Sequence, residues 1–221
     1  MKREIISTKD GSKTIHLPEL NESYHSLHGA LQEAKHVFIR WGWKELKTDH
    51  YQILEIGFGS GLNAILTLIE SEKDKVKVDY TGLEAFPIST EEILALDYKN
   101  VEEIKPYSHL FDALHEAKWN EQTEITSRFI LTKIHQELKD FVPQTASFNL
   151  IYFDAFGPRV QPEMWTIDVF EKMHAALNEN GILVTYCAKG EVRRTLLKLG
   201  FDVSKVPGPP GKREMLFAKK T

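Results

Sequence analysis

The stretch Ile53-Leu54-Glu55-Ile56-Gly57-Phe58-Gly59-Ser60-Gly61-Leu62-Asn63 decides the fold, because an apolar run ends in three alternating glycines and then turns helical. Gly57 and Gly59 can adopt positive φ angles and, having no Cβ, let a ligand lie against the main chain. A helix beginning after Gly61 would direct free N–H groups and its positive dipole end at that ligand. The stretch therefore predicts a strand, a nucleotide-binding turn and a helix. It is not the dinucleotide fingerprint, which needs glycine at Leu62.

A carboxylate follows the next predicted strand. Glu84 ends the strand-like run from Lys75 and stands about 20 residues beyond Gly61, the distance at which doubly wound folds place an acid on the ribose hydroxyls of a bound nucleotide. The alternative is a solvated carboxylate at a strand end. Together, the glycine turn and Glu84 favour a ligand that contains adenosine.

Length and composition bound the class of protein. The 221 residues are 42% hydrophobic, enough to bury one core, and we expect a single domain over residues 1–221, with an N-terminal extension or cap at 1–48 and the core at 49–221. The net charge of −4 gives no global attraction to nucleic acid, so RNA contacts must come from local basic patches. A single cysteine, Cys187, excludes an internal disulfide. With no signal-like or membrane-spanning run, the sequence predicts a cytoplasmic protein without a membrane partner.

Beyond Gly61, β-rich runs alternate with helical ones, which is typical of a mostly parallel sheet flanked by helices. The predicted strands are Ile53–Ile56, Val76–Leu83, Arg128–Lys133, Phe148–Phe153, Gly181–Cys187, Asp202–Val206 and Glu214–Ala218. The predicted helices are Leu62–Ser71, Thr90–Leu96, Lys105–Ala117, Gln136–Phe141, Trp165–Leu177 and Glu191–Leu199. Asn180-Gly181 and Gly200 are predicted helix ends. Pro207–Gly211 is too short for a crossover helix, so the last two strands should form an antiparallel hairpin.

The segment before the glycine turn has two interpretations. Leu31, Ala34, Val37 and Phe38 stand at helical spacing, after a polar stretch that begins near Tyr24. The segment is either a cap over the cofactor or a helix that covers one edge of the sheet.

A second carboxylate, Asp154, follows the strand Phe148–Phe153 and precedes Ala155-Phe156-Gly157-Pro158. Ligands of open α/β sheets bind at the carboxyl ends of the strands. An acid followed by an aromatic residue and a proline at this place resembles the motif of the amino-group methyltransferases, in which this loop receives a primary amine. The resemblance implies that Phe156 forms an apolar wall beside the amine. Alternatively, Asp154 caps the helix that follows Pro162.

Four blocks together resemble one family: Gly29–Phe38, Leu54–Asn63, Phe153–Trp165 and Lys212–Leu216 are similar to the methyltransferase domain of MnmC and its stand-alone relatives, MnmD. The resemblance runs from about Gly11 to Ala218. It implies an α/β, Rossmann-like class I methyltransferase with S-adenosylmethionine as cofactor. The implied sheet has seven strands in the order 3-2-1-4-5-7-6, is mostly parallel and ends in an antiparallel hairpin.

The resemblance also implies a reaction. Members of this family methylate the aminomethyl group of 5-aminomethyl-2-thiouridine at the tRNA wobble position, giving 5-methylaminomethyl-2-thiouridine. Bifunctional members carry an FAD-dependent oxidase domain as well. This sequence has no second glycine fingerprint for a flavin, so we expect no FAD oxidase domain here and a separate oxidase or another supplier of the aminomethyl precursor.

The resemblance and the patterns above name the expected site residues. The expected catalytic residue is Asp154. Cofactor contacts are expected from Glu55, Gly57, Phe58, Gly59, Gly61, Asn63, Glu84 and His135, and substrate contacts from Tyr24, Phe156, Pro158, Lys212 and Arg213. Many methyltransferases have Gly-Asp after the third strand where this chain has Lys133-Ile134-His135-Gln136, so adenine recognition is expected from His135, Gln136 or backbone atoms. The histidines show no metal-ligand spacing with Cys187, and we expect no metal.

The chemistry indicates a role for Asp154. An alkylamine with a pKa of about 10 is only about one-thousandth neutral at pH 7, and its ammonium form has no lone pair to attack a methyl group. We hypothesise that Asp154 positions the amine and accepts its proton, while apolar walls and the cofactor's sulfonium charge favour the neutral nucleophile.

The RNA side of the prediction depends on a basic helix. Lys189, Arg193, Arg194 and Lys198 lie along it, with Lys212 and Arg213 later in the sequence, and such a stripe contacts phosphates or is simply solvated. Two other functions stay open. One is a small-molecule amine methyltransferase or aminopropyltransferase-like enzyme, and the other is a non-catalytic RNA-binding protein with this fold.

Overall fold

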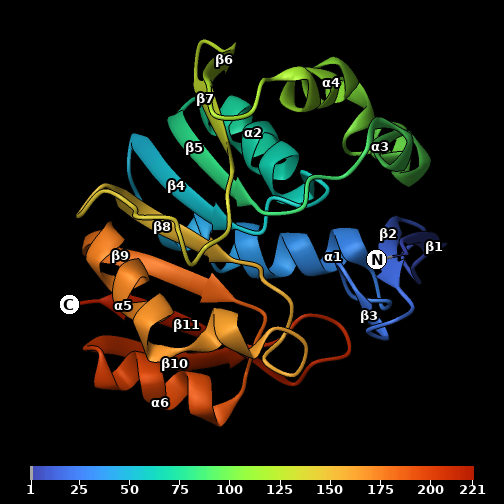
Figure 1. Ribbon diagram of the computed structural model, residues 1–221. Coiled ribbons are helices and arrows are strands. Elements are labelled where there is room, and N and C mark those ends of the chain that lie inside the picture. The colour runs from blue at the N-terminus through green and yellow to red at the C-terminus, as the bar shows by residue number, and fades with distance from the viewer. Residues whose placement is uncertain (1) are drawn as a thin grey trace.

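The computed structural model describes residues 2–221, which build one large sheet between two layers of helices (Figure 1). The strands of this sheet are β4 (His50–Ile56), β5 (Lys77–Glu84), β6 (Gln122–Thr126), β7 (Phe129–His135), β8 (Phe148–Phe153), β9 (Leu177–Thr185), β10 (Phe201–Pro207) and β11 (Glu214–Lys220). Their spatial order is β10-β11-β9-β8-β4-β5-β7-β6. All seven predicted strands are present in the implied order, and the fold class is confirmed. The sheet gains an eighth strand, β6, which pairs antiparallel with β7.

Pairing within the sheet follows the prediction. The five central strands are parallel, and β10 and β11 form an antiparallel hairpin that joins the sheet through β9. Parallel central strands end at the same edge. The carboxyl ends of β4, β5 and β8, which carry the glycine turn, Glu84 and Asp154, therefore lie next to one another.

The helices cover both faces because neighbouring residues of β4 point to opposite sides. Ile53 packs with α2 (Leu62–Asp74) and α4 (Ser108–Glu116) in one buried cluster. Leu54 packs with α5 (Ile167–Ala176) and α6 (Gly190–Lys198) in the other. The other helical elements outside the N-terminal segment Ala30–Arg40 are α3 (Thr90–Leu96), η2 (Trp43–Glu45), η3 (Tyr98–Asn100), η4 (Lys105–Tyr107) and η5 (Pro162–Trp165). Among the described residues, no helix has the length and apolar character needed to cross a membrane.

The N-terminal extension holds more structure than the sequence predicts. β1 (Glu4–Ser7), β2 (Lys13–Leu17) and β3 (Glu22–Ser23) form a separate three-stranded antiparallel sheet, which Figure 1 shows beside the main body. The helix predicted from Leu31 to Phe38 is present as α1 (Ala30–Ala34), which runs on as a π-helical stretch, η1 (Lys35–Arg40). η1 packs on the α2 face of the main sheet, where Phe38 lies 5.0 Å from the Tyr152 ring.

Two local predictions are wrong. Gln136–Phe141 forms a turn rather than a helix, because Pro143 prevents the single turn closed by Phe141 N–H and Glu137 O from continuing. Asn180-Gly181 does not end a helix. α5 stops at Ala176, and Asn180 takes its positive φ of 64° inside β9, where the pairing with β8 shifts register. Gly200, with φ of 93°, does end α6 as predicted.

Candidate active site

A cavity of about 730 Å³ lies at the carboxyl ends of β4, β5 and β8. Eight residues predicted for the site line it: Tyr24, Gly57, Phe58, Gly59, Asn63, Glu84, Asp154 and Phe156. The N-terminal extension supplies further lining through Arg3, Leu17, Leu20 and His25. Residues of the extension and of the glycine turn therefore line the same cavity.

The glycine turn has the conformation that its sequence predicts. Gly57, Gly59 and Gly61 have φ of 91°, 48° and 70°, all in the region that favours glycine. A Cβ at Gly57 would lie 2.7 Å from the Asp154 carbonyl oxygen, and one at Gly59 would lie 3.3 Å from the Tyr24 ring. Close packing of β8 and of the extension against bare backbone thus requires these glycines. Gly61 caps α2 and lies outside the cavity lining.

Glu84 closes the turn from the side of β5. Its Oε2 accepts a hydrogen bond from the Gly59 N–H at 2.8 Å, and its Oε1 accepts one from the Phe86 N–H at 2.8 Å. A carboxylate has about four lone-pair sites, so two acceptor positions remain for a ligand in the cavity. Glu84 therefore shapes the glycine loop and can also receive hydroxyl donors.

Asn63 links the two carboxyl groups of the site. Its Nδ2 donates to Asp154 Oδ2 and to Glu55 Oε1, each at 2.8 Å. Glu55 is fully buried and outside the cavity lining, and Tyr80 donates its hydroxyl to Glu55 Oε2 at 2.8 Å. Burial first, and the nearby carboxyl groups of Asp154 and Glu84, raise the pKa of Glu55 well above its usual range, against the effect of its hydrogen bonds. Glu55, predicted to contact a cofactor, thus lies behind Asn63 and orients it.

Asp154 has the ionisation expected of a base that works near neutral pH. Burial, followed by the negative charge of Glu33, raises its pKa to about 7. The hydrogen bond from Asn63 and the charge of Lys212 act in the opposite direction. A carboxyl group with this pKa exchanges a proton readily at pH 7, as general acid–base chemistry requires.

The walls beside Asp154 are aromatic. Tyr24 and Phe156 meet edge to face with their ring centroids 5.3 Å apart. Arg3, which no sequence signal singled out, ties this wall to the loop after β5. It donates to Phe86 O at 2.7 Å and to Glu92 Oε2 at 3.1 Å, and its guanidinium lies 6.0 Å from the Tyr24 ring.

Four other predicted residues lie outside the cavity lining. The His135 ring packs against Trp119 at 5.8 Å, and Gln136, the alternative for adenine recognition, does line the cavity. Pro158 follows Phe156 in the loop after β8, while Lys212 and Arg213 belong to the hairpin loop between β10 and β11. Lys212 pairs with Glu33 of α1 at 2.9 Å. Among the described residues, no group of three or more His, Cys, Asp or Glu side chains could hold a metal ion.

Comparison with known proteins gives the family. Residues 102–221, more than half of the chain, match the model of the family described as S-adenosyl-L-methionine-dependent methyltransferase. The chain belongs to this methyltransferase family. The matched part includes Asp154, α5, α6 and the terminal hairpin.

This methyltransferase is similar to tRNA 5-methylaminomethyl-2-thiouridine biosynthesis bifunctional proteins MnmC, as the sequence resemblance predicts. It is 31% identical over 210 residues to the one from Methylobacillus flagellatus, which covers 90% of this chain and 32% of that protein. It is 29% identical over 211 residues to the one from Hydrogenovibrio crunogenus, covering 90% and 31%. The chain thus spans about a third of the length of these relatives.

One solved structure is similar to this chain over a larger share of its own length than the MnmC relatives are. The crystal structure of MNMC2 from Aquifex aeolicus superposes with a TM-score of 0.79 at 27% identity, over 100% of this chain and 70% of that chain. The implied relationship and fold are therefore confirmed by an experimental structure.

The cofactor of this methyltransferase is S-adenosylmethionine, and the cavity fits it. The glycine turn presents bare backbone, and Glu84 keeps free acceptor positions for hydroxyl groups. Asn63 Oδ1 is buried and has no hydrogen-bond partner within residues 2–221. A buried acceptor at a cavity wall calls for a donor, and the amino and hydroxyl groups of this cofactor are donors.

A buried lysine lies behind the glycine turn of the methyltransferase. Lys133, 2% exposed, donates to His115 O at 2.8 Å, and its ammonium lies 5.0 Å from the Trp119 ring and 6.0 Å from the Phe58 ring. Burial lowers the pKa of Lys133 to about 8. Lys133 thus packs near the Phe58 ring and does not line the cavity.

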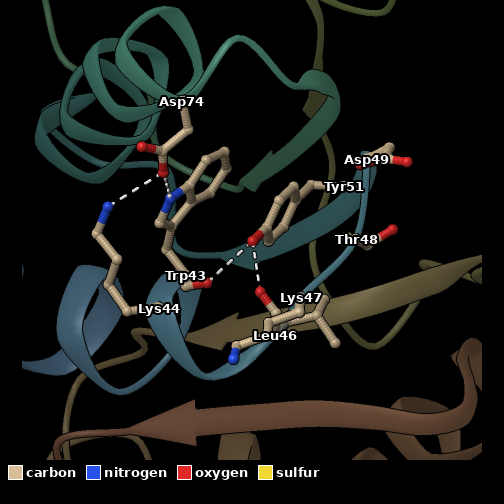
Figure 2. A pocket seen from close by; sticks show the side chains of 8 residues that line it. All are labelled: Trp43, Lys44, Leu46, Lys47, Thr48, Asp49, Tyr51 and Asp74. Atoms are coloured by element: carbon tan, nitrogen blue, oxygen red, sulfur yellow. Dashed lines mark hydrogen bonds and ion pairs between the residues drawn. The ribbon is translucent and has the colours of Figure 1, made fainter.

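A second, shallower pocket of about 460 Å³ lies at the other end of β4. Trp43 and Tyr51 line it, and their polar atoms are bonded to Asp74 and to main-chain oxygens (Figure 2). Their rings are stacked, with centroids 3.9 Å apart. These groups already have partners, and the pocket lies at the amino end of the strand. Its lining is therefore accounted for by packing between η2 and β4.

Proposed function

We propose that this methyltransferase transfers a methyl group to the primary amine of 5-aminomethyl-2-thiouridine at the wobble position of tRNA, giving 5-methylaminomethyl-2-thiouridine. The observation that carries the proposal is Asp154, which borders the cavity with a pKa of about 7 beside the apolar wall of Tyr24 and Phe156. A carboxyl group and an aromatic wall suit an amine better than a hydroxyl or a carbon nucleophile. The choice of this nucleoside rests on the names of the MnmC relatives.

The chain's own residues divide the work. Asn63 holds Oδ2 of Asp154, which leaves Oδ1 for the incoming amine. Asp154 binds the ammonium form, accepts its proton and so exposes the nitrogen lone pair, while the Tyr24 and Phe156 rings disfavour the charged amine by excluding water. Bound S-adenosylmethionine supplies the electrophilic methyl group on its sulfonium. Most of the acceleration then comes from holding the nitrogen in line with that methyl group.

The RNA is proposed to lie on the side of α6 and the terminal hairpin. Arg194 and Lys198 of this helix are exposed, as are Lys189 at its N-cap and Arg213 of the hairpin loop. Such a set of cations suits phosphates of the anticodon arm, and each contact would add to the salt dependence of binding. We further propose that residues 1–48 cap a core at 49–221 as parts of one domain, that the enzyme is cytoplasmic, and that a separate oxidase or another supplier provides the aminomethyl precursor.

Nucleoside analysis tests the proposal. The purified chain is incubated with S-adenosylmethionine and tRNA that carries 5-aminomethyl-2-thiouridine, and digested nucleosides are measured by mass spectrometry. We expect conversion to the methylaminomethyl nucleoside with wild type and none with Asp154→Ala, which should still bind the cofactor in calorimetry. Equal activity on free small amines would favour a small-molecule enzyme. Cofactor binding without any turnover, or no cofactor binding at all, would contradict the proposal.

A further inference from the structure

The N-terminal extension and the terminal hairpin loop meet beside Asp154, although they are far apart in the sequence. The His36 ring is hydrogen-bonded to Pro207 O at 2.7 Å through its Nε2. Gly211 lies so close to His28 that a Cβ there would be 2.3 Å from the imidazole. Between these two contacts, Lys212 Nζ donates to Glu33 Oε1 at 2.9 Å. The ion pair is therefore held between two anchored segments.

Burial and hydrogen bonds fix Glu33 in place. Its side chain is 8% exposed, and its Oε2 accepts a hydrogen bond from the Ser26 N–H at 2.7 Å. The Lys212 side chain is 35% exposed, and its ammonium lies 3.8 Å from the centroid of the Tyr186 ring. The Glu33 carboxylate and the Tyr186 ring thus hold the ammonium at one position, and the Ser26 amide in turn holds the carboxylate.

This ion pair continues to the catalytic loop through Tyr186. The Tyr186 hydroxyl donates to Ala155 O at 2.9 Å, so the ring under Lys212 is bonded to the residue next to Asp154. The two charges also act directly on the carboxyl group: Glu33 raises the pKa of Asp154 and Lys212 lowers it. Asn63 of α2 is hydrogen-bonded to Asp154, and the Asp154 charge acts on Glu55 of β4, Tyr80 of β5 and Tyr186, whose pKa values it helps to raise.

We propose that Glu33 and Lys212 are positioning residues, whose bridge between the extension and the hairpin loop holds the Asp154 loop and balances the charge around its carboxyl group. The inference rests on the proposed function, since it assigns the residues that prepare Asp154 for the amine. No sequence motif pairs these residues, because 179 positions separate them.

Glu33 and Lys212 compensate each other's charge only when both are present. Removing one partner leaves a mostly buried charge without compensation, next to the group that must take up a proton. Removing both restores neutrality but not the tie between the segments. The two single changes should therefore displace the ionisation of Asp154 in opposite directions.

The experiment uses full-length Glu33→Gln, Lys212→Met and the double variant. Relative to wild type, we expect each single variant to lose about tenfold or more in kcat/KM on the aminomethyl tRNA, with calorimetric affinity for S-adenosylmethionine unchanged. The apparent pKa of the pH–rate profile should fall in E33Q and rise in K212M. The double variant should return the profile toward wild type without recovering the rate. Lys99→Met is the matched control, because it breaks an ion pair of 2.8 Å between η3 and Asp112 of α4, and neither residue lines the cavity.

Two further measurements keep the outcomes separate. Lys212→Arg retains the charge and should keep the wild-type profile, even if the methionine variant folds poorly. Titration of ¹³C-labelled Asp154 by NMR in the ligand-free protein should give the same opposite shifts without any turnover. An inactive wild type that shows these shifts would sink the proposed function and leave the bridge intact. An active wild type whose profile and titration are unchanged in both single variants would overturn the bridge.

Discussion

Asp154→Asn should stabilise the protein at neutral and alkaline pH while abolishing methyl transfer. The reason is the raised pKa of Asp154, about 7 in the folded chain. In the unfolded chain the same group ionises near pH 3.9. Between these values the folded state holds a proton that the unfolded state has lost. The stability contributed by the protonated group is therefore complete below about pH 4 and is lost as the pH rises through about 7.

The size of the effect follows from the two pKa values. A difference of about three units, at 1.36 kcal/mol each, sets a ceiling of about 4 kcal/mol. Asp154 borders an open cavity, and water there screens part of its charge, so we expect about half of this ceiling. An asparagine at this position stays neutral, and its oxygen can still accept the hydrogen bond from Asn63. At pH 8 the variant should be more stable by about 2 kcal/mol, or roughly 4–8 °C in Tm for a chain of this size.

Urea unfolding followed by circular dichroism, at half-unit steps from pH 4 to pH 8.5, measures this difference. The two proteins should have nearly equal free energies of unfolding at pH 4 and diverge as the pH rises to 7. Titration of the groups that do not interact with Asp154 cancels in the comparison. A difference that stays constant over the whole range would refute the reasoning, because Asp154 would then have an ordinary pKa.

Three other substitutions test neighbouring features. Gly57→Ala should weaken S-adenosylmethionine binding at least about tenfold, because the new Cβ would lie 2.7 Å from Asp154 O. The control for this calorimetric measurement is Gly11→Ala, which should bind the cofactor normally. Gly11 has a similar φ of 84°, and a Cβ there would meet nothing within 4 Å. Glu84→Gln keeps an oxygen for the Gly59 N–H but loses the charge, so cofactor affinity should fall about tenfold, and wild-type affinity would contradict its assignment. Lys133→Met should raise the free energy of unfolding by up to about 3 kcal/mol at pH 7, because burial lowers the pKa of Lys133 to about 8. The cost of burying the charged Lys133 disappears as the pH rises from 8 to 10.5, so the free energies of unfolding of the two proteins, measured in urea, should converge over this range. A difference that stays constant would contradict a lowered pKa for Lys133.

Local patterns were sufficient for the sheet and for the glycine turn. Apolar runs with sharp glycine or proline boundaries identified the seven main strands, and Gly57, Glu84 and Asp154 follow strands whose ends must meet in a parallel sheet. β6 was missed because an edge strand with the sequence Gln-Thr-Glu-Ile-Thr has little apolar signal. Asn180 misled the helix prediction, since the same residue type serves both a helix end and a bulge with positive φ.

Contacts between distant segments account for what the sequence did not predict in the site. Arg3 reaches the loop after β5, and Glu33 reaches Lys212, through pairings that depend on how the extension folds back over the sheet. Glu55 has the position of a motif residue, yet its orientation toward Asn63 and Tyr80 is decided by the packing of α2 and β5. Such directions arise only in three dimensions, because short-range periodicity says which face a residue takes and not which partner it meets.

The contact between His36 and Pro207 has a consequence for biosynthesis. The two residues are 171 positions apart, so the ribosome adds Pro207 long after His36 has emerged. During translation the extension therefore lacks this contact until the hairpin has left the exit tunnel. A nascent chain cannot form the ion pair between Glu33 and Lys212 until then either.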